Sequence, residues 1–221
     1  MPLQQQANNH HSTNKSSNPA GILASSLPTC FSSSDPLNPT GRNIEILDAV
    51  KGGWAEISAS HSVIRDAVRR VHAEHAHDVD LFIHLGRASS FDYFSVERRA
   101  FRQDMTCTWL SETAEKQGYY LNPDNEGKYV RDMDFPWANV PMGLQSEVPI
   151  ENTVHNANAA LRELGVKGTG RILEVKPHME PGHVGCGFTY YESMANCYVQ
   201  GRQRNVLFCH VPEGVDKTSI D

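Results

Sequence analysis

A cysteine and a histidine in the last part of the chain have the residue types of a nucleophile and its base. Cys186 lies between Gly185 and Gly187, directly before a predicted helix. The unpaired N–H groups and the dipole at a helix N-terminus favour a thiolate, which is the nucleophilic form of cysteine. His210 follows the apolar run 206–209, where a base for Cys186 would be needed. Each residue alone also fits a structural role, as a small buried thiol at a tight turn or a hydrogen-bonded histidine at a strand end.

The segments around these two residues predict an α/β fold. Apolar side chains recur at helical spacing in residues 61–77, 154–164 and 187–200. Short apolar runs predict strands over residues 80–85, 171–175 and 205–211, the first of them ending at Gly86. Helices that alternate with strands favour an open, mainly parallel sheet. Because ligands bind beyond the carboxyl ends of such strands, we expect Cys186 and His210 at one edge of the sheet.

The remaining segments predict less regular structure. Residues 1–17 are polar and show no periodicity, so they cannot bury enough apolar surface to offset the entropy of ordering. We therefore predict a disordered tail over residues 1–17 and a single domain over residues 18–221. Within the domain we expect a short helix over 19–27, a loop over 32–43, a strand over 43–50, and irregular structure with one short helix over 106–148.

Composition excludes several classes of protein. The 221 residues carry 20 Lys+Arg against 26 Asp+Glu, and this net charge of -6 argues against a nucleic-acid partner. No run approaches the roughly 20 apolar residues of a membrane span, and the first residues do not resemble a signal peptide. Five widely spaced cysteines without a Cys-x-x-Cys pair indicate a reducing compartment. We expect a cytoplasmic protein without membrane contact, and the sequence leaves association into a homo-oligomer open.

Three motifs in order resemble one known family. The segment CGFTYYES begins at Cys186, and VLFCHVP contains His210. Upstream, FIHLG ends at Gly86 and is followed by YFSVERRA, which contains Glu97. Together with Asn-Pro-Ala at residues 18–20, these motifs resemble pyroglutamyl peptidase I, a cysteine peptidase family that removes N-terminal pyroglutamate, in the form typical of fungal members.

The resemblance implies a fold and a catalytic triad. The fold would be a three-layer α/β/α sandwich with a mainly parallel, mixed sheet. Cys186 would be the nucleophile, His210 the general base and acid, and Glu97 the carboxylate that orients the imidazole. Taken alone, Glu97 fits a solvated carboxylate beside Arg98 or Arg99, and it is the order Glu, Cys, His that favours the triad.

The implied activity is hydrolysis of peptides with N-terminal pyroglutamate through an acyl-enzyme, without a metal or an organic cofactor. Backbone N–H groups near Cys186 and the segment Gly86-Arg87 would hold the oxyanion. Val184 and Gly185 stand where larger apolar or aromatic residues would pack on the substrate ring. The substrate-binding candidates are thus Gly86, Arg87, Val184 and Gly185.

Two departures from the family leave an alternative open. The sequence has no counterpart of the first strand with its Gly-Phe-Gly-Pro-Phe loop, and residues 213–221 are polar where the family has a closing helix. A catalytically inactive or truncated homologue with a structural or binding role would show these departures.

A metal-binding protein is an alternative of another class. His72 and His75 share one face of the predicted helix over 61–77, and His77 follows them. A second group is formed by His178 and His183, which lie near Cys186 in the sequence. A solvated helix end explains the first cluster better than a metal site does, because no ligand-bearing partner follows it.

Overall fold

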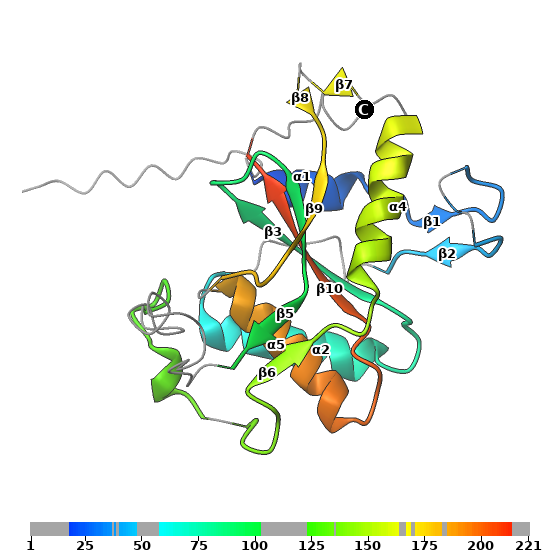
Figure 1. Ribbon diagram of the computed structural model, residues 1–221. Helices are drawn as coiled ribbons and strands as arrows, with labels where there is room; N and C mark the ends of the chain where they lie inside the picture. The colour runs from blue at the N-terminus through cyan, green and yellow to red at the C-terminus, as the bar shows by residue number, and fades with distance from the viewer. Residues whose placement is uncertain are drawn as a thin grey trace, which may run out of the picture.

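The structure is a computed structural model that describes residues 18–36, 38, 40–47, 58–102, 123–134, 136–163, 167–168, 171–182 and 185–213. Figure 1 shows its helices and strands. The helices are α1 (Pro19–Ser26), α2 (His61–His75), the 3-10 helix η1 (Val130–Asp132), α4 (Ile150–Glu163) and α5 (Gly185–Val199). The strands are β1 (Cys30–Phe31), β2 (Ile44–Glu45), β3 (Phe82–Ala88), β4 (Phe94–Glu97), β5 (Arg99–Phe101), β6 (Gly143–Gln145), β7 (Lys167–Gly168), β8 (Arg171–Ile172), β9 (Val175–His178) and β10 (Val206–Pro212).

The central sheet has the strand order β3-β10-β4-β9. Strand β10 is parallel to β3 and antiparallel to β4, and β4 is parallel to β9. Two of the three neighbouring pairs are therefore parallel, which confirms the prediction of a mainly parallel, mixed sheet. The strand that comes last in the sequence lies inside the sheet, between β3 and β4.

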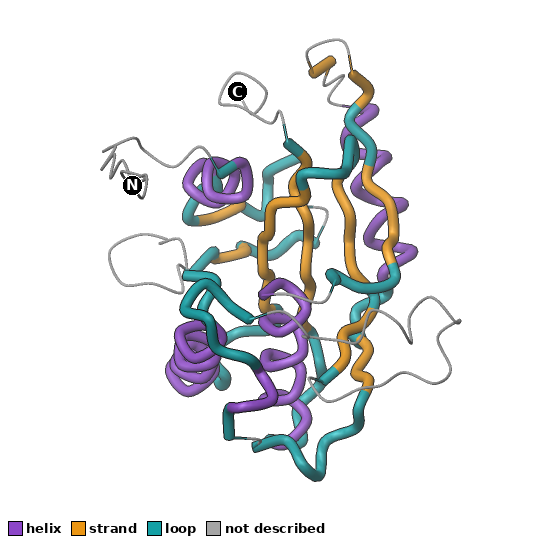
Figure 2. The backbone as a smooth tube through the Cα atoms, turned by 90° about the vertical axis from the view of Figure 1, so that its left-hand side faces the viewer, coloured by secondary structure: helices purple, strands orange, loops and turns teal. Residues whose placement is uncertain are grey.

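Helices cover both faces of this sheet. Side chains alternate along a strand, so the two faces of β10 present different residues to the helices. Leu207 packs with α4 and Val211 with α1, both from one face of β10. Phe208 packs from the opposite face against the buried side of α5. Figure 2 shows α4 and α2 on opposite sides of the strands. The three-layer α/β/α sandwich is confirmed.

Helix α5 is buried along most of its length. It packs between the sheet and α2, and its buried residues run from Gly187 to Cys197 except for Thr189. Helical spacing predicts Phe188, Tyr191 and Tyr198 on the core side, but Tyr198 is 40% exposed. That prediction is wrong because the helix reaches the surface in its last turn, while Tyr190, on another face, is fully buried.

The start of α2 is fixed by a carboxylate from a distant segment. Asp124 accepts a hydrogen bond from the backbone N–H of His61 at 2.9 Å, although Ser60 is the residue that precedes the helix. The same carboxylate accepts from the N–H groups of Glu126 and Lys128. A helix N-terminus needs acceptors for its free N–H groups, and here tertiary structure supplies one.

Several predicted elements have other bounds in the structure. Strand β3 continues through Gly86 to Ala88, and β10 continues through His210 to Pro212, because the two strands pair along their whole lengths. The strand predicted over 171–175 divides into β8 and β9, which belong to different sheets. The segment predicted as irregular contains the short helix η1 and also β6, which pairs with β5.

Some predictions fall outside the described residues. These are the tail over 1–17, residues 48–50 of the strand over 43–50, residues 106–122 of the irregular segment, and Val184. In the part of the chain that is described, no helix is long and apolar enough to cross a membrane.

Candidate active site

Glu97 and His210 meet in the middle of the sheet. Strand β4 lies antiparallel to β10 with Ser95 opposite His210, and Glu97 points to the same face as Ser95 because side chains alternate. Glu97 Oε1 lies 2.8 Å from His210 Nδ1, and its side chain is fully buried. A carboxylate only accepts hydrogen bonds, so Nδ1 carries the proton and Nε2 of His210 is left as the basic nitrogen.

Cys186 approaches His210 from the first turn of α5. The thiol is half-buried and hydrogen-bonds the imidazole of His210. Gly86 pairs with His210 across β3 and β10 and lies close to the same thiol. A Cβ on Gly86 would lie 3.3 Å from Cys186 Sγ and 2.9 Å from the ring of Phe208. The missing side chain at Gly86 therefore leaves room around the sulfur atom.

The pKa of His210 is shifted in the opposite direction from the pKa of two other buried histidines, His72 and His84. Burial alone would lower the pKa of His210, but hydrogen bonds to Cys186 and Glu97 outweigh it and raise the pKa to about 9. Burial would likewise raise the pKa of Glu97, yet hydrogen bonds, first from His210, hold it below its usual value. In contrast, burial lowers the pKa of His72 and of His84 to about 4. His210 is thus held ready to carry a positive charge, whereas His72 and His84 stay neutral.

Sequence reasoning missed two further partners of Glu97. Ser95 Oγ donates to Glu97 Oε1 at 2.6 Å, and His178 Nδ1 lies 2.8 Å from Glu97 Oε2. The spacing Ser-x-Glu was a usable signal, since residues i and i+2 share one face of a strand, but no strand was predicted there. His178 had no comparable signal, because it reaches Glu97 only through the pairing of β4 with β9.

An aromatic side chain covers the histidines of this cluster. The Phe91 ring lies 5.2 Å from the ring of His178 and 6.1 Å from that of His210, measured between centroids. It also stacks on Tyr93 at 4.9 Å. Phe91 therefore gives the surroundings of Glu97 an apolar boundary.

The predicted substrate-binding residues have different positions. Gly86 lies beside the thiol, and Gly185 begins α5 next to Cys186, close to Ile64 of α2. The side chain of Arg87 is not brought to the cluster, because it is 53% exposed and lies 4.0 Å from Glu213. The backbone role predicted for Gly86-Arg87 stays a prediction.

Two of the histidines considered as metal ligands, His72 and His178, serve other contacts. His72 is buried, bonds Ser193 at 2.8 Å and stacks on Phe82. His178 belongs to the Glu97 cluster, and His183 lies outside the described residues. Among the residues that the structure describes, no group of three or more His, Cys, Asp or Glu side chains could hold a metal ion.

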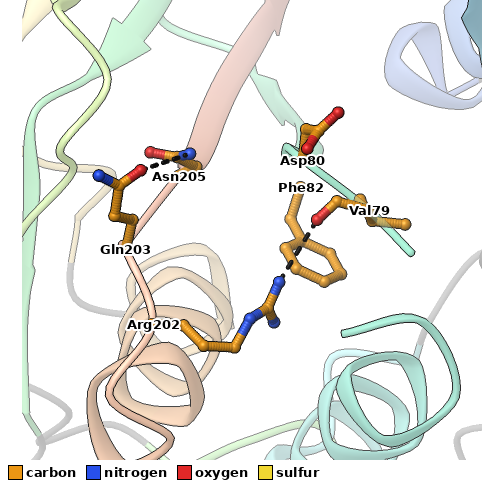
Figure 3. A pocket seen from close by; sticks show the side chains of 6 residues that line it. All are labelled: Val79, Asp80, Phe82, Arg202, Gln203 and Asn205. Carbon is orange, nitrogen blue, oxygen red and sulfur yellow. Dashed lines mark hydrogen bonds between the residues drawn. The ribbon is translucent and has the colours of Figure 1, made fainter. Parts of the chain in front are cut away.

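A cavity of about 260 Å³ lies away from this cluster, where β3 and β10 begin. Figure 3 shows its lining, which consists of Val79, Asp80, Phe82, Arg202, Gln203 and Asn205. Arg202 donates to the carbonyl of Val79 at 3.3 Å, and its guanidinium lies 5.8 Å from the Phe82 ring. Because Gly86 and His210 come later in the same two strands, this cavity is separate from the Cys186 site.

Solved structures of one enzyme share this fold. A variant of pyrrolidone carboxyl peptidase from Pyrococcus furiosus matches with a TM-score of 0.53 and 22% identity, covering 88% of this chain and 73% of that one. A second variant from the same organism matches with a TM-score of 0.50 and 21% identity, covering 71% and 62%. A third P. furiosus structure gives 0.51 and 21%, covering 74% and 64%.

These matches establish a likeness of fold. The chain spans 62% of the length of the second variant and 64% of the third structure. No protein-family model matches the sequence, and no curated protein matches it.

Proposed function

We propose that the protein is a cysteine peptidase that removes pyroglutamate from the N-terminus of peptides. Cys186 is the nucleophile, His210 the base and acid, and Glu97 the residue that orients His210. The observation that carries this proposal is the hydrogen-bonded series from Cys186 through His210 to the buried Glu97. The fold shared with the pyrrolidone carboxyl peptidases supports the substrate class, because pyrrolidone carboxylic acid is pyroglutamic acid.

The residues account for both halves of the reaction. His210 Nε2 takes the proton of the Cys186 thiol, and the sulfur attacks the carbonyl carbon that links pyroglutamate to the next residue. The tetrahedral intermediate collapses to a thioester as His210 returns the proton to the leaving amine. Water, deprotonated by His210, then hydrolyses the thioester and frees pyroglutamate and the thiol.

Backbone groups supply the stabilisation of the oxyanion in this proposal. The first N–H groups of α5 have no acceptor within the helix, and Cys186 is its second residue. Gly86 leaves space beside the sulfur for a carbonyl oxygen to approach these groups. One such donor contributes about 3 kcal/mol to the transition state in other hydrolases.

The direct test is release of a fluorophore from a pyroglutamyl amide by the purified 221-residue chain. Cys186→Ser should abolish turnover and leave the circular dichroism spectrum unchanged. Cys209→Ser is the matched control, because burial raises the pKa of that thiol to about 12 and keeps it protonated. Its turnover should stay within about twofold of the unchanged protein.

Two outcomes would contradict the proposal. Full activity of the Cys186→Ser variant would show that another group is the nucleophile. A folded chain that releases no fluorophore would favour the binding or structural role of an inactive homologue.

A further inference from the structure

We propose that His178 is a positioning residue of the peptidase, holding the Glu97 carboxylate from the side opposite His210. This inference rests on the proposed function. Its physical basis is that Glu97 stands between two imidazoles, with Oε1 toward His210 and Oε2 toward His178, each at 2.8 Å from a Nδ1 atom.

Strand pairing brings His178 to this position. It is the last residue of β9 and lies directly opposite Glu97, the last residue of β4, in the parallel register. The backbone N–H of Arg98 donates to the His178 carbonyl at 3.0 Å. This bond continues the pairing of β4 with β9 past Glu97 and His178. The contact between His178 and Glu97 is therefore fixed by the sheet itself.

The surroundings determine which nitrogen of His178 carries a proton. Nδ1 lies 2.8 Å from Glu97 Oε2 and 2.9 Å from the backbone carbonyl oxygen of Glu180. Both partners are acceptors, so Nδ1 must be the donor and serves both. The carbonyl of Glu180 and the Phe91 ring hold the imidazole in this orientation, which lets it fix the carboxylate in turn.

Glu97 needs such a donor because its side chain is fully buried. Ser95 and His210 both donate to Oε1, so His178 is the described donor to Oε2. Without it, Oε2 would be a buried charged oxygen without a described donor, and only the two bonds at Oε1 would limit rotation of the carboxyl group about its last torsion. The carboxylate would then hold the His210 imidazole less firmly.

A second consequence concerns acid. The hydrogen bond from His178 is one of the contacts that hold the pKa of Glu97 low against burial. If this bond is lost, Glu97 should take up a proton at higher pH and release His210. The titratable side chains around Glu97 are His178 from β9, His210 and Cys209 from β10, and Tyr190 from α5.

Two of these groups stay unchanged as the solution is acidified. Burial raises the pKa of Cys209 to about 12 and also raises that of Tyr190, so both are neutral throughout the acidic range. The acidic limb of a pH profile is therefore sensitive to how firmly Glu97 and His210 are held together.

The test compares His178→Leu with His178→Asn. Leucine fills the space without a donor, whereas the asparagine amide nitrogen can donate from nearly the position of Nδ1. With the pyroglutamyl amide, His178→Leu should lower kcat by about 10- to 100-fold, as expected for loss of a charge-assisted hydrogen bond, with KM within about twofold. Its acidic limb should move to higher pH. His178→Asn should restore most of kcat and the position of the limb.

A second measurement does not need peptidase activity. The rate at which iodoacetamide alkylates Cys186, followed by mass spectrometry of its peptide as a function of pH, should show the same shift of the acidic limb in His178→Leu. His155→Ala, an exposed histidine on α4, is the control and should leave both profiles unchanged.

The outcomes separate this inference from the proposed function. Unchanged kcat and pH profiles in a folded His178→Leu variant would overturn the inference, and so would a His178→Asn variant as impaired as His178→Leu. If the chain has no turnover, or Cys186→Ser keeps it, the proposed function fails. The alkylation profile then still decides whether His178 holds Glu97.

Discussion

Two glutamates of the part of the chain that the structure describes, Glu97 and Glu192, are completely buried, and their partners differ. Glu97 meets partners that can gain or lose a proton, namely His210 and His178. Glu192 on α5 meets Arg65, whose Nε and Nη2 donate to Oε1 at 3.0 and 2.8 Å, and Trp137, whose Nε1 donates to the same oxygen. Arginine keeps its charge at any ordinary pH, so only the Glu97 cluster can move protons.

The difference lies in position as well as in partners. Arg65 comes from α2 and Glu192 from α5, so their ion pair joins two helices. The Glu97 cluster joins strands β4, β9 and β10 and contacts the Cys186 thiol at the start of α5. One carboxylate joins two helices of the helical layer, and the other joins the strands that carry the proposed catalytic residues. Both glutamates follow an aromatic or apolar run in the sequence, so only tertiary contacts separate their roles.

The largest expected effect comes from making Glu97 neutral. Glu97→Gln should lower kcat on the pyroglutamyl amide by about 10³- to 10⁴-fold, because the amide can turn its N–H₂ toward His210 and favour the wrong tautomer. Glu192→Gln is the control and should change kcat per folded molecule by less than about threefold. Equal losses of kcat in the two variants would show that the carboxylates do not differ in role.

Removing the arginine should affect stability and leave the chemistry intact. Arg65→Met leaves Glu192 as an unpaired buried charge and should lower the free energy of unfolding by about 3–5 kcal/mol, measured by urea denaturation. The double variant Arg65→Met, Glu192→Gln should recover part of this loss, since the charge is gone. A stability change below about 1 kcal/mol in Arg65→Met would show that the ion pair contributes little.

The smallest effect is a dependence of stability on pH that His210 of the Glu97 cluster produces and the Arg65–Glu192 ion pair does not. The pKa of His210 is about 9 in the folded protein against 6.5 ordinarily, so protonated His210 stabilises the fold fully below about pH 6.5. This contribution, at most about 3 kcal/mol, is lost as the pH rises through 9. The drop in unfolding free energy from pH 6 to pH 10 should therefore be smaller in His210→Gln than in the unchanged protein. In Arg65→Met the drop should keep its size.

Local pattern predicted the elements that carry the site. The apolar run 206–209 and the turn at Gly185 are features of adjacent residues, and they place His210 on a strand and Cys186 at a helix start. Both expectations agree with the structure because burial and backbone conformation at these positions depend on near neighbours. The resemblance of three motifs added Glu97, which the structure brings to His210.

Contacts between distant segments were beyond the same reasoning. His178 reaches Glu97 through the β4–β9 register, and Asp124 reaches the start of α2 from another part of the chain. Neither partner is marked by periodicity or by a neighbouring residue. For Tyr198 the local pattern gave a wrong prediction. Its helical spacing from Tyr191 predicts a buried side chain, but Tyr198 lies in the last turn of α5 and is exposed.

The interior position of β10 has a consequence for biosynthesis. Strands β3 and β4 are translated long before the strand that separates them, and Val206 must find Phe82 across most of the domain. Such distant pairing is slow to form, because the chain loses loop entropy before any contact compensates it. A growing chain therefore carries Glu97 and Cys186 without His210, and it leaves two strand edges unpaired until the last strand emerges from the ribosome. We expect the nascent protein to be inert as a peptidase and most prone to aggregation in that interval.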